Sequence, residues 1–242
     1  KPRYENPLAQ QLGLWSDDLK REAKLAQLLE DLRGKIRTPI GGTVDWHFAE
    51  AEGTGALPLP KNWRQWPILT SRSVWGTTQK HTWLVADITI PEEARGGTFA
   101  INVISNWRTQ QGSTDPQCLA YLDGKIVQAI DGNHTELVIA HDATPGEVHL
   151  VQMNAFTFDE RPMVGFQTDL ILRDGRIEAL FHDLATAFEV AIRLQQTDGQ
   201  RHAVLERIER ALYTLDRREG QSDALISSLP DAETIAREMH DM

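Results

Sequence analysis

Two short β-rich runs flank Asp123-Gly124 in the segment Gln-Cys-Leu-Ala-Tyr-Leu-Asp-Gly-Lys-Ile-Val-Gln-Ala-Ile, residues 117–130. An Asp-Gly pair suits a two-residue type I′ turn, in which both central residues take positive φ. The sequence therefore predicts an antiparallel hairpin with strands at 117–122 and 125–130.

Similar β-rich runs lie on both sides of this hairpin and are separated by turn residues such as Gly96-Gly97 and Asp131-Gly132. Many short strands at close spacing indicate a sandwich or jelly roll. Further strands are predicted at 44–48, 82–90, 98–105, 136–140, 147–153 and 164–173.

Helical periodicity appears at both ends of the chain. Residues 17–33 have apolar positions at three-to-four spacing, with Ser16 as the expected N-cap. After Asp174-Gly175 two stripes, 177–192 and 204–215, predict a helix pair, and a third helix is expected to begin near Pro230. The predicted fold class is α+β: an N-terminal helix and arm (1–40), a β-sandwich with long Trp-rich loops (41–174) and a helical segment (175–242).

Composition narrows the function classes. The 25 basic and 35 acidic side chains give a formal net charge of -10, which disfavours a nucleic-acid partner because phosphate binding needs clustered Lys and Arg. No apolar run approaches the roughly 18 residues of a membrane-spanning helix, so no membrane partner is expected. The single Cys118 and the polar start suggest a cytoplasmic protein. A start at Lys1 and an end within a helical pattern suggest part of a longer protein.

No catalytic or metal-binding motif is visible among the eight histidines and 35 acids. His134 and Glu136 would share one face of an extended strand, but two ligands do not make a zinc site. The alternative for His134 is a turn residue that makes local hydrogen bonds. We predict no catalytic residue, cofactor or metal ligand in this chain.

Seven tryptophans are present, and five of them, Trp46, Trp63, Trp66, Trp75 and Trp83, lie close together in the sequence. Indole rings stack on the apolar faces of sugars, so a stand-alone carbohydrate-binding sandwich is one hypothesis. The alternative is that these rings fill the core or an interface beneath long loops. Trp75 is the tryptophan that we select as a candidate sugar or interdomain contact.

Residues 119–134, with Asp123-Gly124 followed by Asp131-Gly132-Asn133-His134, resemble a stretch in the non-catalytic N-terminal region of glycoside hydrolase family 38 α-mannosidases, the cytosolic and vacuolar class. Similar segments follow in the same order, and the resemblance spans residues 75–242. Ala129 and Gly132 depart from the family's usual glycine and basic residue. Three further segments carry the resemblance: the strand from Trp83 that ends at 90–94, the helix opening at 180–184, and 211–216.

The resemblance implies a jelly-roll, galactose-binding-like sandwich at the front of a zinc-dependent retaining exo-α-mannosidase. The zinc, the nucleophile and the acid of such an enzyme would lie in a downstream catalytic barrel, which is the expected partner of this chain. Mannose-containing glycans and homo-oligomerisation are expected of the parent. Asn133 and His134 are candidate sugar or interdomain contacts, because loops on a rigid scaffold carry function. A scaffold protein that presents the helix 17–33 to a partner is a further alternative.

Overall fold

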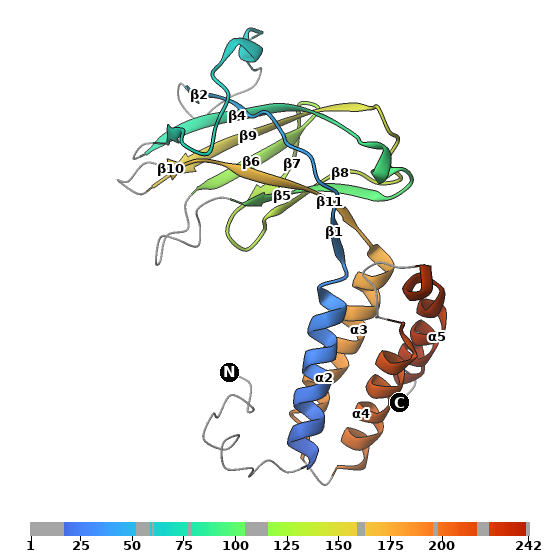
Figure 1. Ribbon diagram of the computed structural model, residues 1–242. Helices are drawn as coiled ribbons and strands as arrows, with labels where there is room; N and C mark the ends of the chain where they lie inside the picture. The colour runs from blue at the N-terminus through green and yellow to red at the C-terminus, as the bar shows by residue number, and fades with distance from the viewer. Residues whose placement is uncertain are drawn as a thin grey trace. The chain divides into compact units, whose positions relative to one another are not determined.

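The computed structural model describes residues 17–51, 59, 61–76, 79–104, 116–158, 163–195, 198–216 and 223–240 (Figure 1). The predicted cap Ser16 and the rest of the N-terminal arm lie outside these residues. The chain forms two compact units: a helical unit (1–37 and 174–242) and a sandwich unit (38–173). The first helix therefore belongs to the same unit as the C-terminal helices, and the chain crosses between the units at 37/38 and 173/174.

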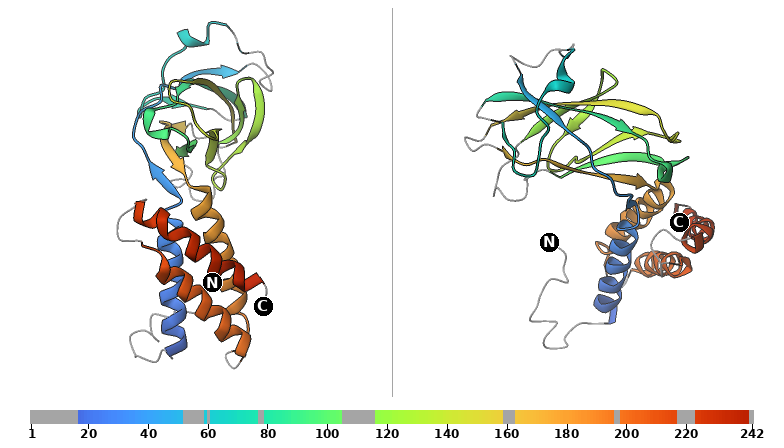
Figure 2. Two further views of the ribbon diagram at one scale, coloured as in Figure 1. Left: turned by 90° about the vertical axis from the view of Figure 1, so that its right-hand side faces the viewer. Right: turned by 45° about the horizontal axis from the view of Figure 1, so that its top comes forward.

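The sandwich unit contains two main antiparallel sheets, which Figures 1 and 2 show from three sides. The four-stranded sheet has the order β1 (Arg37–Pro39), β11 (Gln167–Arg173), β5 (Thr98–Ile104) and β8 (Glu136–Ala140). The five-stranded sheet has the order β2 (His47–Ala51), β4 (Lys80–Thr89), β9 (Val148–Thr157), β6 (Gln117–Leu122) and β7 (Lys125–Ile130). A short pair joins β3 (Val74–Trp75) to β10 (Met163–Val164).

The core of the sandwich forms between the sheets because each strand turns alternate side chains inward. Leu84, Ala86 and Ile88 of β4 belong to the same buried cluster as Phe99 and Ile101 of β5. Residues 83 and 85 of β4 face the opposite side of their sheet and join a separate, smaller cluster. The alternation therefore gives the five-stranded sheet an inner face and an outer face.

Most predicted strands are confirmed, and β6, β7 and β8 have the predicted bounds. The predicted strand 44–48 is shifted: β2 runs from His47 to Ala51, where it pairs with β4. The predicted strand 164–173 is wrong as one element, because it divides into β10 and β11. Gly165, at φ +69°, makes the break, and its carbonyl accepts a hydrogen bond from Trp75 Nε1 at 2.8 Å.

The helical unit packs α2 (Asp17–Arg33), α3 (Gly175–Ala191), α4 (Gly199–Thr214) and α5 (Asp223–His240) around one buried apolar cluster. Asp174 and Asp198 cap α3 and α4 by accepting hydrogen bonds from backbone N–H groups of the first turn. The antiparallel β-sandwich with helices before and after it in the sequence confirms the predicted α+β class. Over the residues that the structure describes, no helix is both long and apolar enough to cross a membrane.

The predicted start of the last helix at Pro230 is wrong, because α5 begins at Asp223 and contains the proline. Leu225 and Leu229 before the proline are fully buried, as is Ala232 after it. This continuous apolar stripe stabilises the helix across a residue that lacks the N–H for one intrahelical hydrogen bond.

Candidate functional site

The turn between β6 and β7 has the predicted geometry and is fastened to the neighbouring strand. Asp123 and Gly124 have φ values of +51° and +78°, as a type I′ turn requires. The Asp123 carboxylate accepts a hydrogen bond from the Leu150 N–H at 2.9 Å and lies 2.9 Å from His149 Nδ1. Burial alone would raise the pKa of Asp123, but the hydrogen bonds from His149 and Leu150 outweigh it and lower that pKa. The carboxylate thus holds the hairpin against β9.

The next turn, residues 131–134, is clamped by Asp131. Its Oδ1 accepts hydrogen bonds from the backbone N–H groups of Asn133 and His134, both at 2.8 Å, and lies 3.1 Å from His134 Nδ1. The backbone hydrogen bond from Asn133, followed by that from His134, lowers the pKa of Asp131. The local hydrogen bonds predicted for this turn are therefore present, and the Asp131 carboxylate is the group that accepts them.

This arrangement leaves the two predicted contact residues at the surface. The His134 side chain is 73% exposed, and Asn133 is also exposed. His134 is near Asp131, whereas Glu136 lies 3.9 Å from the guanidinium of Arg173. Across the described ranges, no three or more His, Cys, Asp or Glu side chains gather as metal ligands. His134 and Glu136 therefore have different partners, and a contact role for Asn133 and His134 stays a prediction.

Trp75 lies in the core of the sandwich unit. Its side chain is 4% exposed, its Nε1 donates to Gly165, and its ring meets Phe166 edge-on at 6.0 Å between centroids. Trp63 and Trp83 are buried as well, so the expectation that these rings fill apolar clusters is confirmed. The predicted sugar or interdomain contact of Trp75 stays a prediction, with little of its ring surface free.

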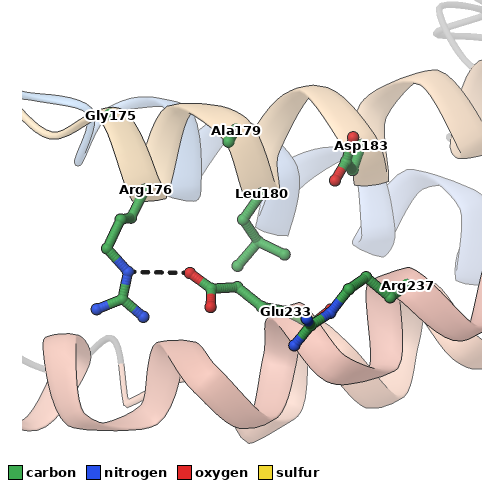
Figure 3. A pocket seen from close by; sticks show the side chains of 7 residues that line it. All are labelled: Gly175, Arg176, Ala179, Leu180, Asp183, Glu233 and Arg237. Atoms are coloured by element: carbon green, nitrogen blue, oxygen red, sulfur yellow. Dashed lines mark hydrogen bonds and ion pairs between the residues drawn. The ribbon is translucent and has the colours of Figure 1, made fainter.

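A pocket of about 320 Å³ lies in the helical unit, where α3 faces α5. In Figure 3 Leu180 projects from α3 toward α5, beside the ion pair between Arg176 and Glu233. The Arg176 Nε lies 3.0 Å from Glu233 Oε1, and that hydrogen bond raises the pKa of Arg176. Arg237 and Asp183 complete the charged lining. Because two guanidinium groups balance two carboxylates, the pocket favours neither an anion nor a cation.

Sequence reasoning missed both Asp131 and this pocket. An Asp at the start of a polar turn often accepts a hydrogen bond from the backbone N–H two residues later, in an Asx turn. That pattern could have identified Asp131. Arg176 and Glu233 are 57 positions apart, and no local pattern connects them.

No protein-family model matches the sequence, and a search of curated proteins finds no match. Among solved structures, the chain is similar to a Ruminococcus gnavus β-glucuronidase, with 14% identity, a TM-score of 0.36, and coverage of 57% of this chain and 28% of that chain. It is also similar to a Faecalibacterium prausnitzii β-glucuronidase, with 17% identity, a TM-score of 0.34, and coverage of 50% and 21%. The chain thus spans less than a third of either enzyme. At these identities and TM-scores the similarity says nothing about what this chain does.

Proposed function

We propose that this chain is a non-catalytic accessory region of a glycoside hydrolase, specifically the N-terminal region of a zinc-dependent retaining α-mannosidase. Its work is to pack on a catalytic domain, shape the rim of the active site and support assembly of a homo-oligomer. The zinc and the reacting carboxylates belong to the catalytic domain, which acts on mannose-containing glycans in the cytoplasm.

One observation carries the proposal: the residues that resemble the α-mannosidase family form a fastened hairpin and a clamped turn. Residues 119–134 include most of β6, all of β7 and the turn that Asp131 holds. Asp123 ties the hairpin to β9 at Leu150. A rigid hairpin that presents exposed polar side chains suits a surface which positions a neighbouring domain.

The hairpin also exposes apolar side chains, which supports a packing role. Ile126 is 65% exposed and Val127 is 46% exposed on the edge strand β7, and Leu119 of β6 is 38% exposed. Apolar side chains grouped on an edge strand are a liability unless another chain or domain covers them. A downstream catalytic domain is the occupant that the family resemblance implies.

The proposal is tested by expressing the chain together with the coding sequence that follows residue 242. The extended protein is expected to hydrolyse an aryl α-mannoside with retention of configuration, and to lose that activity when zinc is removed with a chelator. An aryl β-glucuronide is the matched control substrate, and no turnover of it is expected. An extended protein that cleaves the glucuronide but not the mannoside would overturn the α-mannosidase assignment while leaving a glycosidase.

A further inference from the structure

The pocket between α3 and α5 contains two pairs of opposite charges (Figure 3). At one end Arg176 and Glu233 form an ion pair, with Nε and Oε1 3.0 Å apart. At the other end lie Asp183 of α3 and Arg237 of α5, and no hydrogen bond or ion pair joins these two side chains in Figure 3. The first pair is thus compensated within the protein, and the second pair is not.

Asp183 and Arg237 also lack an opposite charge elsewhere in the described part of the chain. The Asp183 carboxylate has no hydrogen-bond or ion-pair partner there. The Arg237 guanidinium donates to the Glu233 carbonyl and to the Thr234 hydroxyl, both at 3.3 Å, and both acceptors are neutral groups of its own helix. Both charged side chains are exposed, so a ligand from solvent can reach them.

The wall between the two pairs of charges is apolar. Leu180 is 2% exposed and projects toward α5, and Ala179 and Gly175 line the same side of the pocket. The volume of about 320 Å³ lies at the lower end of the range for small-molecule pockets. An apolar wall with a few charged groups around it is the usual lining of such a site. The ligand that fits is small and has both an apolar part and charged groups.

We infer that this pocket binds a free α-amino acid with an apolar side chain. The ammonium group of the amino acid pairs with the Asp183 carboxylate, and its carboxylate accepts hydrogen bonds from the Arg237 guanidinium, whose planar fork suits a carboxylate. The apolar side chain lies against Leu180. A ligand with a single charge would be attracted by one of the two protein groups and repelled by the other, whereas a zwitterion satisfies both.

This site goes beyond the proposed function, because it depends on the helical unit alone. It needs neither zinc nor a catalytic domain. A failure of the binding experiment below therefore leaves the accessory role untouched, and a failure of the hydrolysis experiment leaves the amino-acid site untouched.

The test uses the full 242-residue chain and titrates it with L-leucine by calorimetry. Saturable binding is expected with a dissociation constant of about 0.1–10 mM, because two charge-assisted contacts at an open site give a modest affinity. Isoamylamine, which is leucine without its carboxylate, and 4-methylpentanoate, which is leucine without its amino group, are the matched control ligands. Each is expected to bind at least about tenfold more weakly than leucine.

Two substitutions each remove one of the charges that hold the ligand. Asp183→Asn and Arg237→Gln are each expected to weaken leucine binding at least about fivefold. Both positions are exposed, so the variants are expected to fold, which circular dichroism checks. Glu189→Gln and Arg193→Gln are the matched controls, because these residues form an exposed ion pair outside the pocket. Neither control is expected to change the affinity.

Three results would overturn the inference. The first is a folded chain that shows no saturable binding of leucine up to about 50 mM, a concentration that detects weak sites. The second is binding of either single-charge ligand as tightly as leucine. The third is wild-type affinity for leucine in either Asp183→Asn or Arg237→Gln.

Discussion

The helical unit and the sandwich unit both bury polar side chains, but they treat them differently. In the helical unit Arg201 is 1% exposed and its guanidinium pairs with the carboxylate of Glu22, which is 5% exposed. In the sandwich unit the buried amides of Gln152 and Asn154 each retain an atom without a hydrogen-bond partner. One unit thus buries a pair of opposite charges, whereas the other buries neutral amides. Both keep buried polar atoms without a hydrogen-bond partner among the described residues.

The difference shows what each buried group contributes. A buried charge without its counter-charge is strongly unfavourable, so the pair of Arg201 and Glu22 ties α4 to α2 in one arrangement. Arg201 still keeps Nε and Nη1 without a hydrogen-bond partner, so the compensation rests on the one ion pair and on Asp18 at 3.9 Å. An unpaired buried amide costs less than an unpaired buried charge. Four substitutions, three of them with a control variant, test this difference.

Replacing Arg201 with Met is expected to have the largest effect. It leaves the buried Glu22 carboxylate without its partner, and we expect a loss of about 3–5 kcal/mol in the free energy of unfolding of the helical unit. Urea unfolding followed by helical circular dichroism measures it. The double variant Arg201→Met/Glu22→Leu is expected to recover most of the loss, because it removes both charges.

A partly exposed ion pair between the same helices provides the control. Arg21 and Glu209 are 2.7 Å apart with side chains about a third exposed, and Arg21→Met is expected to cost at most about 1 kcal/mol. Equal costs for Arg21→Met and Arg201→Met would contradict the role assigned to burial.

Trp75→Phe tests a buried polar group that is paired within the sandwich unit. The substitution removes the donor to the Gly165 carbonyl and leaves a small cavity beside Phe166. We expect the free energy of unfolding to fall by about 2 kcal/mol, measured by thermal unfolding followed by tryptophan fluorescence. Trp66→Phe, at a half-buried ring, is expected to cost clearly less. A larger loss at Trp66 would mean that the Trp75 hydrogen bond is unimportant.

Asp131→Ala tests the clamp on the turn and carries a pH signature. Loss of the hydrogen bonds to Asn133 and His134 is expected to lower the free energy of unfolding by about 1 kcal/mol at neutral pH. Because the folded-state pKa of Asp131 is lowered, its stabilisation is present above the unfolded-state value near 4 and disappears as the pH falls through the folded-state value. The difference between wild type and variant should therefore shrink below about pH 4.

Asn133→Ala is the control for the clamp that Asp131 makes. The Asn133 side chain is exposed, so its removal is expected to change the free energy of unfolding by less than about 0.5 kcal/mol. A cost for Asn133→Ala as large as that for Asp131→Ala would contradict the assignment of the clamp to Asp131.

Gln152→Met is expected to have the smallest effect on stability. The two side chains have similar shape, and the substitution removes a buried acceptor that has no partner in the described part of the chain. The free energy of unfolding, measured by chemical denaturation, is expected to change by less than about 0.5 kcal/mol or to rise slightly. A loss above about 2 kcal/mol would show that the amide has a structural role, and the contrast between the two units would fail.

Much of the fold was predictable because its signals are local. The Asp123-Gly124 turn and the alternation around it determine β6 and β7, and the apolar period of α2 is visible in seventeen consecutive residues. The division at Gly165 was not predictable from alternation, because it depends on Trp75, ninety positions away. The early start of α5 depends on burial of Leu225 and Leu229 by other helices.

The candidate sites were less predictable because they depend on strand register and helix packing. Asn133 and His134 were selected from a turn, but the side chain that holds that turn is Asp131. The ring contact between His81 and Phe156 joins residues 75 positions apart, which become neighbours only when β4 pairs with β9. No spacing rule in the sequence connects such residues.

The proposal on which the rest depends is that bond cleavage takes place in a catalytic domain and not in these residues. The most direct test is the hydrolysis of an aryl α-mannoside by the purified 242-residue chain, with and without added zinc. We predict no turnover above the uncatalysed background in either condition. Zinc-dependent release of the aryl group by this chain alone would contradict the claim.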